Sequence, residues 1–361
     1  MEDLNKPLGA AELSEEARRA LEGPMKAMAA RGLAPLADAR DLLSVLFQLS
    51  TDPDGQIRAA ATKTARGLPE NLTAPALERS DLSPKVLHFF AALVKRDSLA
   101  AEKILLNQVT ADETIVDLGR RASEREVNLI VANEERLLRA PAIIGSIYAN
   151  TKALQSVVDR AIELAIRNQV RVPGIAAWED LVHELMSSGH VVRDEGPVAD
   201  PIEGGKLDQL VRRYMSLGDD EAIPNPQAVH ELRVTTQMRI ASMGPTMLRN
   251  ALLRSRKSAV AMAAIKSPKV TEADAAKYAG NLSLGEEVIR YISSRREWTK
   301  SYGVKTALVN NPKCPMPSAM KLMPFLRERE LSKLARSKNI PSALRAQARK
   351  LTITRKGGKR R

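Results

Sequence analysis

The side chains that most often bind metals are few and scattered in this sequence. The four histidines are His88, His183, His190 and His230, and no two of them are four residues apart. His183 is followed by a glutamate, but not by the second histidine that a zinc-protease helix requires. His183 and His190 could share a helix face, yet Gly189 lies between them. We therefore predict no metal site, and we interpret His88, beside two phenylalanines, as a histidine at the edge of a core.

The sequence also lacks the usual patterns for a nucleophile or a phosphate loop. Its single cysteine, Cys314, stands between Lys313 and Pro315. A nearby lysine and a helix start could lower the pKa of this thiol, but an inert small residue in a turn is the simpler interpretation. No serine lies in a Gly-x-Ser-x-Gly elbow, and the glycines at 204 and 205 lack the rest of a P-loop. The sequence predicts no catalytic residue, no cofactor and no enzymatic activity.

The composition indicates an all-α fold. The chain has 361 residues, of which 44% are apolar but only 3% are aromatic. Small aliphatic side chains fill the core between helices well, whereas sheets favour aromatic and β-branched residues in alternation. No sustained alternation of apolar and polar residues occurs along the chain.

The same features predict a cytoplasmic protein that does not insert into a membrane. The longest uncharged apolar stretch, residues 140–151, is shorter than the roughly 18 residues that a spanning helix needs. The first five residues are acidic and polar, unlike the start of a secretory signal. One cysteine cannot form an internal disulfide framework.

Helix signals recur from the start of the chain. Ser14 precedes two glutamates, which predicts a capped helix start. Residues 41–49 place apolar side chains at the spacing of one helix face, and 52–55 (Asp-Pro-Asp-Gly) form a turn before a second helix from Ile57. This helix–turn–helix resembles a HEAT repeat, in which a similar turn is followed by an aliphatic residue and an arginine. The resemblance covers about forty residues and implies stacked helices.

Asparagines punctuate the next segment at regular intervals. Asn133, Asn150 and Asn168 are 17 and 18 residues apart, a spacing that suits one helix and one turn. We expect each asparagine to end its helix in the left-handed conformation, which asparagine tolerates. Such iteration is typical of an α-solenoid, in which each unit buries its face against its neighbours.

The second half contains a related junction pattern. Residues 298–315, with Trp298, Asn311-Pro312 and Pro315, resemble the leucine-rich repeat variant, a family of stacked short helices. Some members carry an iron–sulfur domain, but that domain needs several cysteines. Positions 41–352 as a whole resemble a bacterial family of helical-repeat proteins without assigned chemistry, on the basis of residues 133–138, Pro141, 159–165, Trp298 and Asn311-Pro312. These resemblances imply a fold and no activity.

Charge and punctuation divide the chain into four parts. We predict an acidic HEAT-like helical array over 1–195, a Pro- and Gly-rich connector over 196–226, a basic helical-repeat array over 227–352 and a basic disordered tail over 353–361. Residues 227–361 hold 29 lysines and arginines against 8 aspartates and glutamates, although the whole chain has a net charge of only +13. Residues 1–226 therefore carry a net negative charge. This asymmetry is typical of a chain with one half that faces a polyanion, but basic helix faces can also simply be solvated.

Three groups of basic residues are candidates for binding a polyanion. They lie in the helices over 232–264, around Trp298 and in the C-terminal tail. The candidates are Arg233, Arg239, Arg249, Arg254, Arg256, Lys257, Arg290, Arg295, Arg296, Lys300, Arg355, Lys356, Lys359, Arg360 and Arg361. Trp298 could stack a base within its cluster, but packing between repeats is the simpler interpretation.

Two hypotheses about function follow. In the first, the array is a non-catalytic scaffold or regulatory adaptor that binds a protein partner. In the second, the basic half binds a phosphate-rich nucleotide or nucleic acid, and the scarcity of aromatic residues favours duplex backbone over single strands. We favour the scaffold on the sequence alone.

Overall fold

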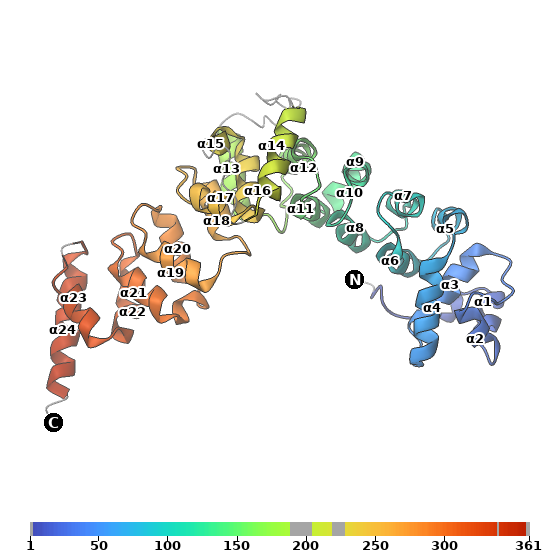
Figure 1. Ribbon diagram of the computed structural model, residues 1–361, viewed down its shortest axis with the longest axis horizontal. Helices are drawn as coiled ribbons and strands as arrows, with labels where there is room; N and C mark the ends of the chain where they lie inside the picture. The colour runs from blue at the N-terminus through green and yellow to red at the C-terminus, as the bar shows by residue number, and fades with distance from the viewer. Residues whose placement is uncertain (1–2, 188–203, 219–227, 338, 359–361) are drawn as a thin grey trace. The chain divides into compact units, whose positions relative to one another are not determined.

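The computed structural model describes residues 3–187, 204–218, 228–337 and 339–358, with side chains at 204–207 and 356–358 left out. Within these ranges the chain forms 24 α-helices and three short 3₁₀ helices, and no strand (Figure 1). The predicted all-α class is therefore confirmed. In the described ranges, no helix combines the length and apolar character that crossing a bilayer requires.

The chain divides into two compact units, Met1–Gly174 and Ile175–Arg361. The helices of the first unit are η1 (Ala10–Glu12), α1 (Glu15–Ala20), α2 (Met25–Ala30), α3 (Ala39–Ser50), α4 (Gly55–Gly67), α5 (Glu70–Leu77), α6 (Pro84–Leu93), α7 (Leu99–Leu106), α8 (Asp112–Gly119), α9 (Glu124–Ala132), α10 (Glu134–Arg139), α11 (Ala142–Ala149) and α12 (Gln155–Arg167).

The helices of the second unit are α13 (Trp178–Ser187), α14 (Gly204–Ser216), α15 (Ala228–Glu231), α16 (Val234–Met243), α17 (Thr246–Leu252), α18 (Ser258–Ile265), α19 (Glu272–Gly280), α20 (Glu286–Ser294), η2 (Trp298–Lys300), α21 (Tyr302–Asn310), α22 (Met316–Leu322), η3 (Met323–Phe325), α23 (Glu328–Leu334) and α24 (Ser342–Gly358).

In the first unit, most helices pack against the helix after next. Helices α3, α5, α7 and α9 form one such series, and α2, α4, α6 and α8 form another, which continues to α11. Figure 1 shows α5, α7 and α9 side by side. Each helix pair is short, so it buries its apolar face only when the next pair covers it.

Local sequence chemistry sets the helix starts of this unit. The predicted cap at Ser14 is confirmed, since its hydroxyl accepts a hydrogen bond from the Ala17 amide at 3.0 Å. After the turn at 52–54, the Asp54 carboxylate caps α4 by accepting a bond from the Gln56 amide at 2.8 Å. Arg58 then donates to the backbone carbonyls of Asp52 and Pro53. The predicted helix–turn–helix over 41–61 therefore forms as α3 and α4.

None of the asparagines predicted to end a helix has the left-handed conformation, since φ is −93° at Asn133, −82° at Asn150 and −87° at Asn168. Asn107, Asn150 and Asn311 have extended backbone, with φ between −67° and −89°, and not the left-handed conformation. Each side chain is buried and donates to a helix-end carbonyl about thirty residues earlier. Asn150, for example, donates to the carbonyls of Gly119 and Ala122 at 2.9 and 2.8 Å. At these three positions the bond to a distant acceptor explains the choice of asparagine, whereas Asn133 caps α10 and Asn168 bonds within its own helix.

Basic side chains bond to carbonyls at helix junctions in the same way. Arg121 donates to the carbonyl of Ala91, and Lys313 donates to those of Leu282 and Leu284. Buried Arg136 donates to the carbonyls of Gln108 and Thr110 at 3.1 and 2.9 Å. Ala91 lies in the last turn of α6, where a carbonyl has no intrahelical partner, and the other acceptors lie in the loops between α7 and α8 and between α19 and α20.

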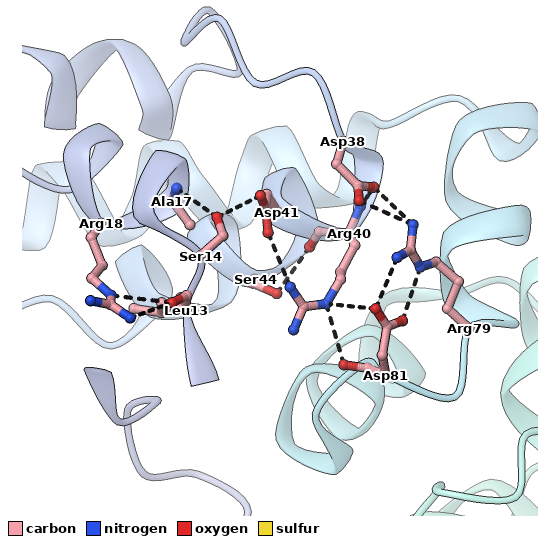
Figure 2. A network of polar contacts seen from close by, with 10 residues as sticks. All are labelled: Leu13, Ser14, Ala17, Arg18, Asp38, Arg40, Asp41, Ser44, Arg79 and Asp81. Carbon is pink, nitrogen blue, oxygen red and sulfur yellow. Dashed lines mark hydrogen bonds and ion pairs between the residues drawn. The ribbon is translucent and has the colours of Figure 1, made fainter. Parts of the chain in front are cut away.

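An ion-pair network joins the start of α3 to the turn between α5 and α6 (Figure 2). Arg79 lies between Asp38 at 3.0 Å and Asp81 at 2.8 Å. Arg40 pairs with Asp81 and Asp41 at 3.4 Å each. Asp41 also accepts a bond from the hydroxyl of Ser14 at 2.6 Å, which ties the start of α1 to α3.

The second unit begins earlier than the sequence predicted. Helix α13 falls in the predicted first array, but it packs against α16 and α18 of the second unit. The reason is its buried face of Trp178, Leu181 and Leu185 at helical spacing. The described part of the predicted connector contains α14, which packs against α16.

The C-terminal tail also differs from the prediction. Helix α24 continues through Gly358, so residues 353–358 are helical where the sequence predicted disorder. Arg355 accounts for the continuation, because its guanidinium donates to the carbonyls of Leu326 and Pro324 and holds this turn against η3. Lys359, Arg360 and Arg361 lie outside the described residues.

Asn311 and its neighbour Asn310 provide a matched test of the junction bonds. Asn311 is 1% exposed and bridges the Ala279 carbonyl and the Lys313 amide, whereas exposed Asn310 bonds only within its own helix. We expect Asn311→Ala to lower the free energy of unfolding by about 1–3 kcal/mol, because two buried backbone groups lose their partner. Asn310→Ala should change it by less than about 0.5 kcal/mol. Urea unfolding followed by circular dichroism measures both, and equal losses would contradict this role.

Candidate functional site

Two of the predicted polyanion-binding arginines lie in the core and not on the surface. Arg239 and Arg249 are each 1% exposed, and Arg249 donates to the carbonyl of Gly244 at 3.2 Å. Arg239 belongs to α16, which packs against α13, α14, α17 and α18 and buries every residue from Val234 to Ser242. A helix covered on all sides has no solvent face, so the prediction of a surface role for these two residues is wrong.

Three other candidates are engaged in the fold. Arg290 pairs with Glu286 on the same helix at 2.7 Å. Arg355 donates to the carbonyls of η3 and its C-cap, as described above. Arg233 is half-buried at the start of α16. The Lys356 side chain and residues 359–361 lie outside the described part of the chain.

The remaining candidates form two separate groups. Arg254 and Arg256 are exposed and Lys257 is half-buried, all just before α18. Arg295, Arg296 and Lys300 are exposed around η2 and are called the η2 cluster below. Ser258, the neighbour of Lys257, bonds Glu287 at the start of α20. The η2 cluster follows the end of α20, where Lys266 also lies over the Tyr291 ring. The two groups therefore lie at opposite ends of α20.

Aromatic rings hold part of the η2 cluster in place. The Arg295 guanidinium lies 5.1 Å from the Tyr291 ring centre, and the Lys266 ammonium lies 5.7 Å from it. Trp298 is half-buried and meets Tyr291 edge to face, with ring centres 5.9 Å apart. Such cation–π contacts orient a charged group while leaving it accessible to a ligand.

Glu297 directly follows Arg296 and is exposed, whereas three other acidic side chains of the second unit bind helix-start groups. Asp274 accepts bonds from the amide and hydroxyl of Thr271 in a capping box. Glu287 accepts a bond from Ser258, and Glu330 accepts one from Tyr302. These three carboxylates are therefore used locally, and the η2 cluster forms no ion pair with a described residue within 4 Å.

The cysteine and His88, which could take part in catalysis, are held within the fold. Cys314 is buried, and burial raises the pKa of its thiol to about 11, so it is almost entirely protonated at neutral pH. The Nδ1 atom of His88 lies 2.9 Å from the hydroxyl of buried Thr114. Among the residues that the structure describes, no three His, Cys, Asp or Glu side chains gather where they could hold a metal ion.

The structure shows a surface on α4 that the sequence analysis did not identify. An open groove of about 750 Å³ follows α4 and is lined in part by Arg58, Lys63 and Arg66. At Arg66 and Gly67 it joins a pocket of about 560 Å³ between the ends of α4 and α6 and the starts of α5 and α7. A signal was present, since α4 carries three cations and no acidic residue within an otherwise acidic unit.

Comparisons of the chain with protein-family models, with curated proteins and with solved structures give no match.

Three carboxyl groups of the first unit have pKa values below their ordinary range. Burial alone would raise the pKa of Glu12, but bonds from Gly9, Ser83 and Lys85 outweigh it. For Asp52 burial is likewise outweighed by Lys26 at 2.5 Å, the Asp54 amide and the charge of Arg58. The hydrogen bond from Arg79 is the main cause of the lowered pKa of Asp81.

These shifts predict acid sensitivity. Because each group has a lower pKa folded than unfolded, the unfolded chain binds more protons as the pH falls. Stability is therefore complete above the ordinary carboxyl range, and we expect the melting temperature to fall between about pH 5 and pH 3. Glu12→Gln should flatten this dependence, because its bonds to Ser83 and Lys85 no longer involve a titrating group. The exposed Glu15→Gln change is the control, and an unchanged profile in Glu12→Gln, followed by circular dichroism, would contradict the assignment.

Proposed function

We propose that this chain is a non-catalytic, cytoplasmic scaffold or regulatory adaptor that binds a protein partner. In this proposal both units are α-solenoid arrays, with HEAT-like helix pairs in the first and pairs similar to the leucine-rich repeat variant in the second. Stacked helix pairs present long surfaces that suit extended partners.

The observation that carries the proposal is the set of polar contacts between successive helix junctions. Most acceptors lie 25 to 34 residues before their donors, from Ser267 to the Ser242 carbonyl at the short limit and from Thr64 to the Ala30 carbonyl at the long limit, although Arg40 donates forward to the Asp81 carbonyl. A nearly constant separation means that each helix pair is fixed against the one before it, as a repeat array requires. The single thiol is buried and protonated, which also favours binding over covalent catalysis.

Affinity purification of the tagged full chain, with and without nuclease, tests the scaffold. We expect a protein partner to co-purify after nuclease treatment and to form a stoichiometric complex when both proteins are purified. Loss of every co-purifying protein on nuclease treatment would contradict a direct protein partner.

A second candidate function is binding of duplex nucleic acid through the backbone. The η2 cluster favours it, because three exposed cations lie close together in the sequence and Tyr291 orients one of them, Arg295. Arginine side chains held in this way suit phosphate oxygens, which give affinity without reading sequence.

Fluorescence polarisation of labelled duplex DNA and RNA across a salt series tests this candidate. Affinity should fall with salt at a log–log slope of about −0.9 for each phosphate neutralised on B-DNA. The triple variant Arg295→Gln, Arg296→Gln, Lys300→Gln should make this slope shallower. The exposed pair Lys152→Gln, Arg160→Gln in the first unit is the control. If the affinity for duplex changes neither with salt nor in the triple variant, the η2 cluster is not the nucleic-acid-binding surface.

A further inference from the structure

The groove along α4 is distinguished by charge that the rest of the fold does not use. Lys63 and Arg66 are exposed, and neither forms an ion pair with a described residue within 4 Å. Several other cations of the first unit pair with acids, as Lys85 does with Glu12 and Arg79 with Asp38 and Asp81. Arg58 is fixed by its bonds to the carbonyls of Asp52 and Pro53, so its charge is held at the groove. Three positive charges thus line α4, which carries no acidic residue.

The pocket that continues the groove has a different character. Its walls include the apolar side chains of Leu68, Phe90 and Leu93, and Arg66 and Lys95 also line it. Both cations are exposed. Glu70 lines the pocket too, but its carboxylate accepts a bond from the Ala100 amide at 3.1 Å, at the start of α7. A volume of about 560 Å³ is within the range of small-ligand pockets and accommodates a single large apolar side chain.

We propose that the α4 groove and its pocket bind an extended, acidic segment of a protein partner. One apolar side chain of the segment, of the size of leucine or phenylalanine, lies in the pocket between α4, α5, α6 and α7. Carboxylates on either side of it contact Arg66 and Lys95 at the pocket and Lys63 along α4. This site assignment rests on the scaffold function proposed above, and it names the chemistry of the partner.

Charge complementarity and the pocket together select this occupant. Arginine pairs with carboxylates in a bidentate geometry, which fixes the register of an acidic segment along the helix. A nucleic-acid backbone would also meet the cations, but it has no side chain to fill the apolar pocket. A single buried apolar anchor with a charged rim is a common arrangement where a few residues provide most of the affinity.

A phage-displayed library of random linear peptides, selected on the immobilised full chain, tests the assignment without a known partner. We expect enriched peptides to be acidic and to share one large apolar residue. A fluorescein-labelled copy of an enriched peptide should bind the double variant Arg66→Glu, Lys95→Glu at least about tenfold more weakly than the wild type, because two attractive contacts become repulsive. Enrichment of basic peptides, or of none, would overturn the assignment.

A second variant blocks the groove without changing charge. Gly67 lines both the groove and the pocket, and a Cβ atom added there meets no atom within 4 Å. Gly67→Leu should therefore fold normally and place its side chain where the peptide lies. We expect about tenfold or greater loss of peptide affinity with an unchanged melting temperature.

The control is Lys152→Glu, Arg160→Glu, which makes the same charge change at exposed positions of the first unit outside the groove. It should retain full affinity. If the enriched peptides bind all three variants equally while a protein partner still co-purifies, the groove assignment is wrong and the scaffold proposal stands. Tight duplex DNA binding that Arg66→Glu, Lys95→Glu abolishes, without peptide enrichment, would assign the groove to nucleic acid and overturn the peptide proposal.

Discussion

A helix end leaves backbone carbonyls without partners, and this fold supplies many of those partners from the next junction along the chain. Asn107 and Asn150 do so with side-chain amides, and Arg121 does so with its guanidinium. The helices themselves are short and pack mainly through alanine and aliphatic side chains, which fit together in several registers. Directional bonds at the junctions select one register, so the apolar packing depends on them.

The same requirement changes the meaning of the positive charge. An arginine that donates to carbonyls, as Arg121 and Arg355 do, stabilises the fold and is partly removed from the surface field. Arg239 and Arg249 go further, because each side chain is 1% exposed. The formal charge of the basic half therefore overstates the charge that a ligand can contact, and the η2 cluster is a larger share of that charge than composition suggests.

Local chemistry in the sequence predicted the features that depend on near neighbours. The cap at Ser14, the turn from Asp52 to Gly55 and the helical class all follow from residues within one or two turns. The conformation of Asn150 could not be predicted in this way, since both left-handed and extended backbone end a helix and the distant carbonyls of Gly119 and Ala122 decide between them.

The burial of α16 and the pocket beside α4 were harder to predict from the sequence, because both depend on tertiary contacts. Helix α16 intersperses threonine, glutamine and arginine with apolar residues, so its sequence does not reveal that every side is covered. The basic run on α4 was visible in the sequence, but its pocket is formed by the ends of α4 and α6 and the starts of α5 and α7, which only the fold brings together. The exposed candidate arginines Arg295 and Arg296 lie in a turn and not in a packed helix.

Most of the junction bonds have a direction, because the donor follows its acceptor in the chain by 25 to 34 residues. During synthesis an acceptor carbonyl therefore emerges first and stays solvated until its donor has been made. Each helix pair can take its final place only when most of the following pair has left the ribosome. Folding of this chain must then lag translation by about one helix pair throughout, and a pause inside a pair would leave one open junction and not a disordered unit.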